Sequence, residues 1–392
     1  MQRGIKRAVA FAAAVLAAAF LCGCTRLADV NLRLVVHAVG VDIIDDGIWR
    51  ASYQVFNAQP AQEGGPVDAT DQNVVTIVTY GRSLYETQKS LELQTGKEVL
   101  TGDVELIVLG RGFTPTQECI GEDISGVLSY FWNNYDIYMG VNVVFSEGDA
   151  ADIVSAELEH GTAAAELLNR MILSAQEYTR TVPTRLIEAS NRLSDECSGF
   201  IVPMMSAYST SVPEGLDGAD IYDKYIAVTA SVLVSGGVPV KILAPQQSQG
   251  VSILSGRADK LSYELMCDGK RVSAEIDVKK IERKISLSEA SDAESEKMLV
   301  PVLDVTLHGK VKLKDYPDGY DENAVIAAAE QMIKDVCSQG REAVSAYPCD
   351  ALGILRMLKR YQNEFYNRSS GEYESLLGGA VVNVGVKLDI TE

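Results

Sequence analysis

Residues 35–59 read VVHAVGVDIIDDGIWRASYQVFNAQ and carry the clearest fold signal in the chain. Two runs rich in β-branched and aromatic residues flank the tripeptide Asp45-Asp46-Gly47. An Asp-Gly pair supplies the positive φ that a tight hairpin turn needs, and the flanking residues favour strands. The stretch therefore predicts an antiparallel β-hairpin.

Strands and helices alternate after this hairpin. Residues 60–73 contain two prolines and a glycine pair and predict a loop, and residues 74–80 predict a further strand. Ser83 and Glu86 have the spacing of a capping box, so a helix is predicted at about 84–95. The same patterns predict a strand at 104–110, a helix through 124–131, a strand at 138–147, a helix capped by Asp149 and a helix opened by Pro183.

Two polar segments interrupt the second half of the chain. Residues 206–221 are rich in Ser, Gly, Asp and Pro and indicate a domain boundary. Residues 286–297 form a polar, acidic segment that indicates a second linker or an exposed loop. Around them, period-two apolar patterns predict half-buried strands, and apolar residues three and four apart predict helices. The predicted elements are a hairpin at 225–244 around Gly236-Gly237, strands at 271–278, 303–313 and 382–390, and helices at 322–345 and 350–366.

The predicted fold class is α+β, with mostly antiparallel sheets and flanking helices. A chain of this length exceeds the roughly 250 to 300 residues at which a single core stops growing, which favours several domains. The predicted divisions are a signal peptide at 1–23, an N-terminal α+β domain at 24–205, a middle β-rich domain at 206–297 and a C-terminal α+β domain at 298–392.

The first residues, MQRGIKRAVAFAAAVLAAAFLCGC, have the layout of a secretory signal, because three basic residues precede an uncharged apolar run. Leu21, Gly23 and Cys24 resemble a lipobox. We expect cleavage between Gly23 and Cys24 and diacylglycerol on the Cys24 sulfur, whose two acyl chains suffice for stable anchoring. The alternative is an uncleaved anchor helix with two incidental cysteines.

The chain is strongly acidic, with 35 Lys and Arg against 54 Asp and Glu. Removal of residues 1–23 takes away three basic residues and no acidic ones, which leaves a net charge of −22. Such a surface repels nucleic acid and anionic lipid headgroups and favours a cationic loop of a partner. We therefore expect no nucleic-acid partner.

The remaining cysteines indicate neither a disulfide framework nor a metal site. Five follow the lipobox, widely spaced and without a CxxC pair: Cys119, Cys197, Cys267, Cys337 and Cys349. Cys337 and Cys349 form one candidate disulfide, but buried free thiols are the favoured interpretation.

The sequence contains no recognisable catalytic constellation. It has no GxSxG, SxxK, HExxH, P-loop or Rossmann glycine pattern. His37, His160 and His308 fall on separate predicted elements and do not suggest a zinc site. Asp42, Asp45 and Asp46 lack the glycine and distal Glu of a calcium loop and are interpreted as turn residues. We expect no catalytic residue, no metal and no enzymatic activity.

Four segments of the chain, taken in order, carry a family resemblance. The hairpin region contributes Gly40, Asp42, Asp46-Gly47, Trp49 and Gln54, and the next segment contributes Gly81, Gly96-Lys97, Gly102 and Gly110. The third segment is residues 136–153, and the fourth is the end of the chain, with Tyr361, Phe365 and the closing strand VVNVGVKLDI. In this order the segments resemble the Ger(x)C family, the C-subunit lipoproteins of spore germinant receptors. Asp103 replaces a usual His and Thr25 a usual Trp, as in a divergent member.

The resemblance implies a non-enzymatic, three-domain lipoprotein on the outer face of the spore inner membrane. It implies integral membrane partners, an A-type and a B-type subunit, and a requirement for nutrient-triggered germination. Diacylglycerol on Cys24 would be the sole attached group. The alternatives are a solute-binding lipoprotein, which the Asp-Gly and Gly-Gly hairpins disfavour, and a lipid-anchored hydrolase, for which the sequence offers no nucleophile and base.

Overall fold

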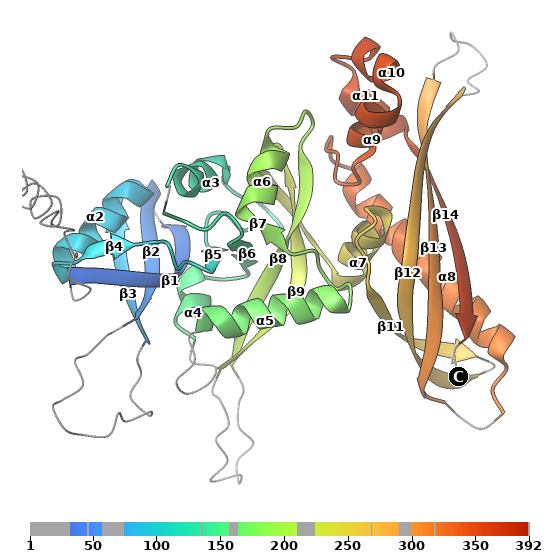
Figure 1. Cartoon of the computed structure of the whole chain (residues 1–392), viewed down its shortest axis with the longest axis horizontal. Coiled ribbons are helices and arrows are strands. Elements are labelled where there is room, and N and C mark those ends of the chain that lie inside the picture. The colour runs from blue at the N-terminus through green and yellow to red at the C-terminus, as the bar shows by residue number, and fades with distance from the viewer. Residues whose placement is uncertain are drawn as a thin grey trace, which may run out of the picture.

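The computed structural model describes residues 32–44, 47–56, 74–134, 136–156, 164–209, 224–267, 269–289, 299–316 and 319–390. These residues form two sheets with helices packed on them (Figure 1). The α+β fold class is therefore confirmed. The predicted signal peptide and the predicted loop at 60–73 lie outside the described residues.

The first sheet is mixed, with the strand order β10-β9-β8-β6-β5-β1-β2-β3. Its hairpins are antiparallel and lie toward its two ends, whereas the central pairs β1-β5, β5-β6 and β6-β8 are parallel. The predicted hairpin is confirmed, because Ile44 lies opposite Ile48. The strands are β1 (Arg33–Ile44), β2 (Ile48–Phe56), β3 (Val74–Gly81), β4 (Glu98–Leu100), β5 (Leu106–Leu109), β6 (Asn142–Ser146), β7 (Thr184–Arg185), β8 (Gly199–Ser209), β9 (Lys224–Ser235) and β10 (Val238–Leu243).

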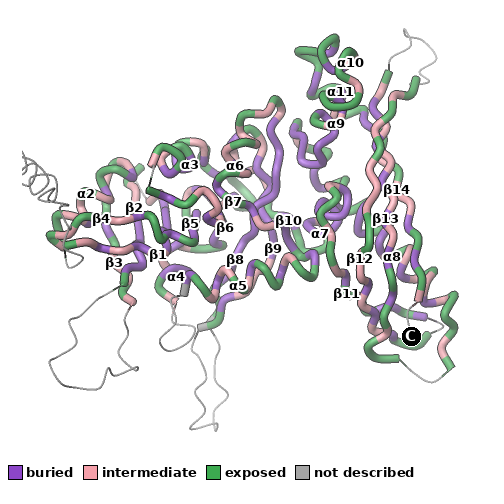
Figure 2. The backbone as a smooth tube through the Cα atoms, in the orientation of Figure 1, coloured by how far each residue is buried: buried purple, intermediate pink, exposed green. Residues whose placement is uncertain are grey.

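Helices cover both faces of this sheet, so its central strands are buried on both sides (Figure 2). All four residues of β5 are fully buried, with Ile107 and Leu109 in one core cluster and Leu106 and Val108 in the other. This burial explains why β5 is a continuous apolar run instead of an alternating one. The covering helices are α2 (Leu84–Thr95), α3 (Ser125–Trp132), α4 (Ala150–Val154), α5 (Ala164–Glu177) and α6 (Leu186–Leu193).

The predicted start of α2 is confirmed. The Ser83 Oγ accepts a hydrogen bond from the Glu86 amide at 3.2 Å. The Glu86 carboxylate accepts the amide of Arg82 at 2.8 Å, one residue before the cap. Pro183 differs from the prediction, because it precedes the short strand β7 and α6 begins only at Leu186.

The second sheet has the order β11-β12-β13-β14. The predicted alternation is confirmed in β13, where Leu303, Val305, Leu307 and Val311 are all buried. The last strand, β14, runs parallel to β13, because α8 carries the chain back along the sheet between them. The elements are α7 (Pro245–Leu254), β11 (Lys260–Cys267), β12 (Lys270–Glu289), β13 (Leu299–Asp315), α8 (Glu322–Ser345), α9 (Ile354–Tyr361), α10 (Asn363–Arg368), α11 (Tyr373–Gly379) and β14 (Val381–Ile390).

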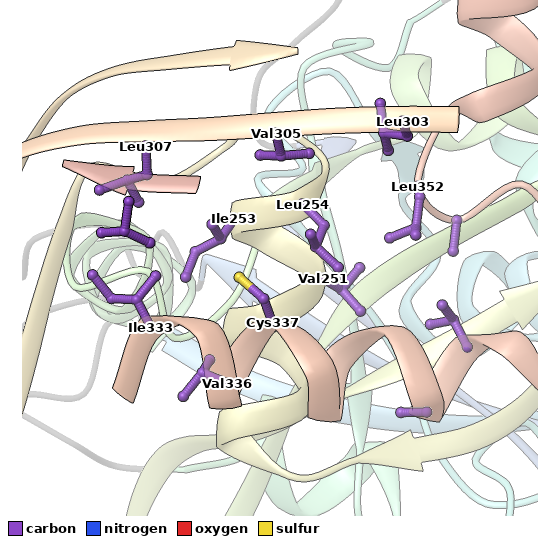
Figure 3. Close-up of a cluster of buried hydrophobic side chains, with 14 of the residues drawn as sticks. Val251, Ile253, Leu254, Leu303, Val305, Leu307, Ile333, Val336, Cys337 and Leu352 are labelled. Atoms are coloured by element: carbon purple, nitrogen blue, oxygen red, sulfur yellow. The ribbon is translucent and has the colours of Figure 1, made fainter. Parts of the chain in front are cut away.

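The helix α7 lies between the two sheets (Figure 1) and packs closely on α8. A β-carbon on Gly250 would lie 2.1 Å from the Val336 carbonyl oxygen, so the two helix backbones are in contact. Figure 3 shows side chains of α7 between those of β13 and α8. This cluster buries Val251, Ile253, Leu254, Leu303, Val305, Leu307, Ile333, Val336 and Cys337.

Two other predictions from the second half of the chain need correction. The polar segment at 286–297 is in part a strand, since β12 continues to Glu289 paired with β13. The predicted helix at 350–366 is divided at Gln362 into α9 and α10, where Gln362 leaves helical geometry with φ −134°. The helix at 322–345 is confirmed as α8.

The segment predicted at 206–221 begins inside β8, because residues 206–209 belong to that strand, and residues 210–221 lie outside the described residues. β8 and β9 pair antiparallel in one sheet, with Ser209 opposite Lys224. One core cluster also contains Ile201, Leu233 and Leu243 together with residues of the second sheet. The three-domain division stays a prediction.

Candidate functional site

The predicted attachment residue Cys24, with Gly23 beside it, lies outside the described residues. Within the described ranges, no helix is both long enough and apolar enough to cross a bilayer. Most of the residues that carried the family resemblance lie within the described ranges. Several of them meet at one buried ionic network around Asp42.

Asp42 lies near the end of β1 and is completely buried. Its Oδ1 accepts hydrogen bonds from the amides of Arg111 and Ala150, both at 2.8 Å. Its Oδ2 accepts two from the Arg50 guanidinium, at 3.1 Å from Nε and 2.9 Å from Nη2. The interpretation of Asp42 as a turn residue is therefore wrong. Asp45 and Asp46 lie outside the described residues.

Asp149 closes this network from the start of α4. One carboxylate oxygen lies 2.8 Å from Arg50 Nη2 and the other lies 2.8 Å from Arg111 Nε. Asp149 occupies the predicted N-cap position, but its side chain makes no capping hydrogen bond. The amide of Ala150 donates to Asp42 instead, which leaves the Asp149 carboxylate for the two arginines.

Glycine is required beside Asp42. A β-carbon on Gly110 would lie 2.2 Å from Asp42 Oδ1 and 2.3 Å from the Ala150 amide nitrogen. A β-carbon on Gly40 would lie 3.0 Å from the Ala150 side chain. Gly40 and Gly110, two of the glycines in the resemblance, therefore let α4 approach the sheet closely enough for the Ala150 amide to reach the carboxylate.

Burial raises the pKa of Asp42, while the hydrogen bonds from Ala150, Arg50 and Arg111 oppose that effect. Both carboxylate oxygens already accept two hydrogen bonds, and no part of the residue reaches solvent. A general base needs access to the proton that it removes. The network therefore fixes β1, β2 and α4 relative to one another and offers no site for a substrate.

Two further residues of the resemblance have structural contacts. Gln54 is buried, donates to the Val154 carbonyl at 2.9 Å and accepts the Ala165 amide at 3.2 Å. It therefore connects β2 to α4 and α5. Trp49 packs edge-on against Phe113, with ring centroids 5.7 Å apart.

The thiols and histidines form no reactive centre in the described part of the chain. Cys337 and Cys349 are free and buried, as favoured from the sequence. Burial raises the pKa of Cys337 to about 12 and that of Cys349 to about 11, so both thiols stay protonated at neutral pH. Within the described ranges, no group of three or more His, Cys, Asp or Glu is placed to hold a metal ion. His160 lies outside those ranges.

A basic cleft is the main feature that the sequence did not reveal. It has a volume of about 530 Å³ and lies between α6, the end of α7, β12 and α9. Among the described residues, its lining contains six cationic side chains and no acidic one: Arg192, Arg257, Arg283, Arg356, Lys359 and Arg360. The cations come from separate segments of the chain, so no local motif announces them.

Two family models match the chain. The model described as spore germination protein N-terminal domain matches residues 28–207, and the model described as spore germination B3/GerAC-like, C-terminal, matches residues 230–392. The chain belongs to the Ger(x)C family of germinant-receptor C subunits. Its family membership thus rests on both halves of the chain.

The Ger(x)C fold is also known from a solved structure. The crystal structure of the GerBC protein matches with a TM-score of 0.53 and 14% sequence identity, covering 90% of this chain and 97% of that chain. At this identity the likeness shows a common fold alone. No sequence among the curated proteins matches the chain.

Proposed function

We propose that this C subunit is a non-enzymatic, lipid-anchored component of a nutrient germinant receptor. Diacylglycerol on Cys24 would hold it on the outer face of the spore inner membrane, where it assembles with integral membrane A-type and B-type subunits. The observation that carries the proposal is the match of two germination-family models to residues 28–207 and 230–392.

The lipobox supports the anchoring. Leu21, Gly23 and Cys24 have the required spacing, and the first family model begins shortly after Cys24, at residue 28. Two acyl chains hold a protein stably at a bilayer without a protein segment in it. The folded body would then lie beside the membrane with its N-terminal sheet nearest the anchor in sequence.

An exposed sheet edge supports assembly with membrane partners. β3 is the last strand in the order of the first sheet, and among the described residues it pairs only with β2. Val75, Val78 and Tyr80 on this strand are exposed. An open strand with apolar side chains is a surface on which a partner can add a strand or bury its own apolar residues.

The states of the buried carboxylate and thiols support a non-enzymatic role. Asp42 is saturated with hydrogen bonds, and the buried thiols of Cys337 and Cys349 are protonated at neutral pH. These groups would therefore support the fold, and the subunit would act through binding.

Gene deletion in the native spore-former tests the receptor role. We expect loss of germination in the cognate nutrient and normal germination with a non-nutrient trigger that bypasses receptors. Normal responses to a broad nutrient panel, after deletion of paralogues, would contradict the proposal and favour a solute-binding lipoprotein.

Complementation tests the anchor separately. Cys24→Ala should leave the precursor uncleaved and lower the nutrient response. Cys22→Ala is the matched control, because it removes the neighbouring thiol and keeps the lipobox cysteine. Normal processing and function of the Cys24→Ala chain would refute the anchoring claim.

The β3 surface is tested by co-purification with the membrane subunits. Val78→Glu should reduce their recovery, because it places a charge on the exposed strand edge. Met266→Glu on β11 is the matched control, since Met266 is also exposed but lies on the second sheet. Equal recovery with both variants would exclude this edge as the contact.

A further inference from the structure

The basic cleft contains a guanidinium that forms no ion pair with a carboxylate among the described residues. Arg283 on β12 donates through Nη1 to the Ser255 carbonyl at 3.2 Å and through Nη2 to the Leu352 carbonyl. Its Nε is buried and has no hydrogen-bond partner among the described residues. Burial lowers the pKa of Arg283, the charge of the buried Asp350 carboxylate raises it, and the charge on Arg257 lowers it. The guanidinium is thus held in place by two backbone carbonyls, and only the nearby Asp350 carboxylate partly balances its charge.

A second guanidinium reaches the same point. A β-carbon built on Gly353 would lie 3.8 Å from Arg283 Nη2, 3.9 Å from Arg283 Nη1 and 3.8 Å from Arg356 Nη2. Gly353 has no side chain there and adopts φ +74°, a left-handed conformation that glycine tolerates. The two arginines therefore converge on a space that the backbone leaves open.

Two carboxylates lie near these arginines, and neither forms a strong ion pair with them. Asp350 is buried and accepts the amides of Ile354 at 2.5 Å and Arg356 at 3.3 Å at the start of α9. Asp195 lies 3.8 Å from Arg356 Nε, but both side chains are well exposed to solvent, which weakens such a pair. Arg192 and Arg257 form no ion pair with a described residue. Five of the six cations therefore form no ion pair with a carboxylate within the described chain.

One acidic residue lies in an adjoining hollow. Glu188 on α6 shares that hollow with Arg192 and Arg257, and its carboxylate accepts the Arg185 amide at 3.5 Å. It does not line the basic cleft. The excess of positive charge in the cleft remains in a chain whose net charge is −19.

We propose that this cleft binds a small anion carrying phosphate or carboxylate groups, with Arg257, Arg283 and Arg356 as its main contacts. Guanidinium groups match these oxyanions because they present planar, paired N–H donors. The cleft volume of about 530 Å³ lies within the range of small-ligand pockets, roughly 300–1,000 Å³. The acidic body would repel an extended anionic surface, whereas a small anion can enter the local positive field.

Phosphate chemistry has two sources, a soluble metabolite and a lipid headgroup, and calorimetry distinguishes them. The mature chain, which begins at Cys24, would be titrated in neutral detergent separately with pyrophosphate, citrate and dihexanoylphosphatidylglycerol below its micelle concentration, at constant ionic strength. We expect saturable binding of at least one probe. Pyrophosphate or citrate binding would indicate a soluble ligand, and binding of the lipid alone would assign a headgroup to the same cleft.

Variants locate the binding. Arg257→Gln should weaken the affinity at least about tenfold, the effect of losing one charge-assisted hydrogen bond. Arg271→Gln is the matched control, because Arg271 is an exposed cation of β12 outside the cleft. Arg283→Lys keeps the charge and loses the paired donors, so it should also weaken binding while circular dichroism confirms the fold.

Two results would overturn the proposal: no saturable binding of any probe, or equal weakening in Arg257→Gln and Arg271→Gln. Neither result would bear on the receptor role, which the germination assays test independently.

Discussion

The Asp42 network and the basic cleft differ in how far their positive charges are balanced by carboxylates. Around Asp42, two carboxylates and two arginines pair within about 3 Å, and every oxygen of Asp42 is used. In the cleft around Arg283, six cations line the wall and no carboxylate of the described ranges does. The first centre is complete without a ligand and stabilises the fold. The second has unused binding capacity, which marks it as a place for an anion.

Removal of Arg50 should have the largest effect on this comparison. Arg50→Ala would leave Asp42 buried without its counter-ion, a change that costs about 3–5 kcal/mol of unfolding free energy. Urea denaturation measures it. Arg271→Ala should cost well under about 1 kcal/mol, because its pair with Glu264 is exposed. Equal losses in the two variants would show that the Asp42 network is not a structural centre.

Replacing a glycine with alanine beside each centre should destabilise the packed Asp42 network more than the open cleft. Gly110→Ala would force Cβ against Asp42 and should cost about 3 kcal/mol. Gly353→Ala meets nothing closer than 3.8 Å, so only its left-handed backbone, about 1 kcal/mol, opposes it. Thermal unfolding of both variants gives the order. A larger loss at Gly353 would contradict the open cleft.

The buried carboxyl next to the cleft should give a pH signature. Burial raises the pKa of Asp350 to about 6, from 3.8. The folded chain therefore holds this proton more tightly than the unfolded chain, and stability falls as pH rises from about 4 to 6. The loss is about 2–3 kcal/mol relative to Asp350→Asn, by the usual conversion of pKa shifts. Parallel stability curves for the two chains across this range would exclude the ionisation.

The smallest expected effect has the opposite sign. Arg257→Gln should stabilise the chain by about 0.5 kcal/mol at low salt, because it removes repulsion among the cleft cations. A saturating anion should abolish or reverse this gain. Denaturation with and without pyrophosphate measures it. Destabilisation by Arg257→Gln at low salt without an anion would show that this cation is already balanced.

Local signals predicted much of the fold. The Asp-Gly turn predicted the hairpin, Ser83 predicted the start of α2, and a period-two apolar pattern predicted β13. The parallel centre of the first sheet was not predicted, because parallel pairing joins strands separated by helices and leaves no turn signature. The same limit applies to the cleft, whose arginines converge only in the folded chain.

The Asp42 pair could have been found from the sequence. A hairpin that turns at residues 45–47 places Asp42 opposite Arg50, as the observed register has it. A carboxylate opposite a guanidinium on two apolar strands predicts a buried ion pair. What the sequence could not supply is Asp149, which reaches the pair from a helix more than 90 residues away.

The contact of α7 with α8 has a mechanical consequence. α7 directly follows β10 of the first sheet and precedes β11 of the second, and residues 248–254 are all buried. At Gly250 and Gly340 the two helix backbones touch, and packed interiors compress little. The joint therefore behaves as a stiff coupling instead of a hinge. A load applied by a neighbour to one sheet would reach the other as a displacement of the whole body.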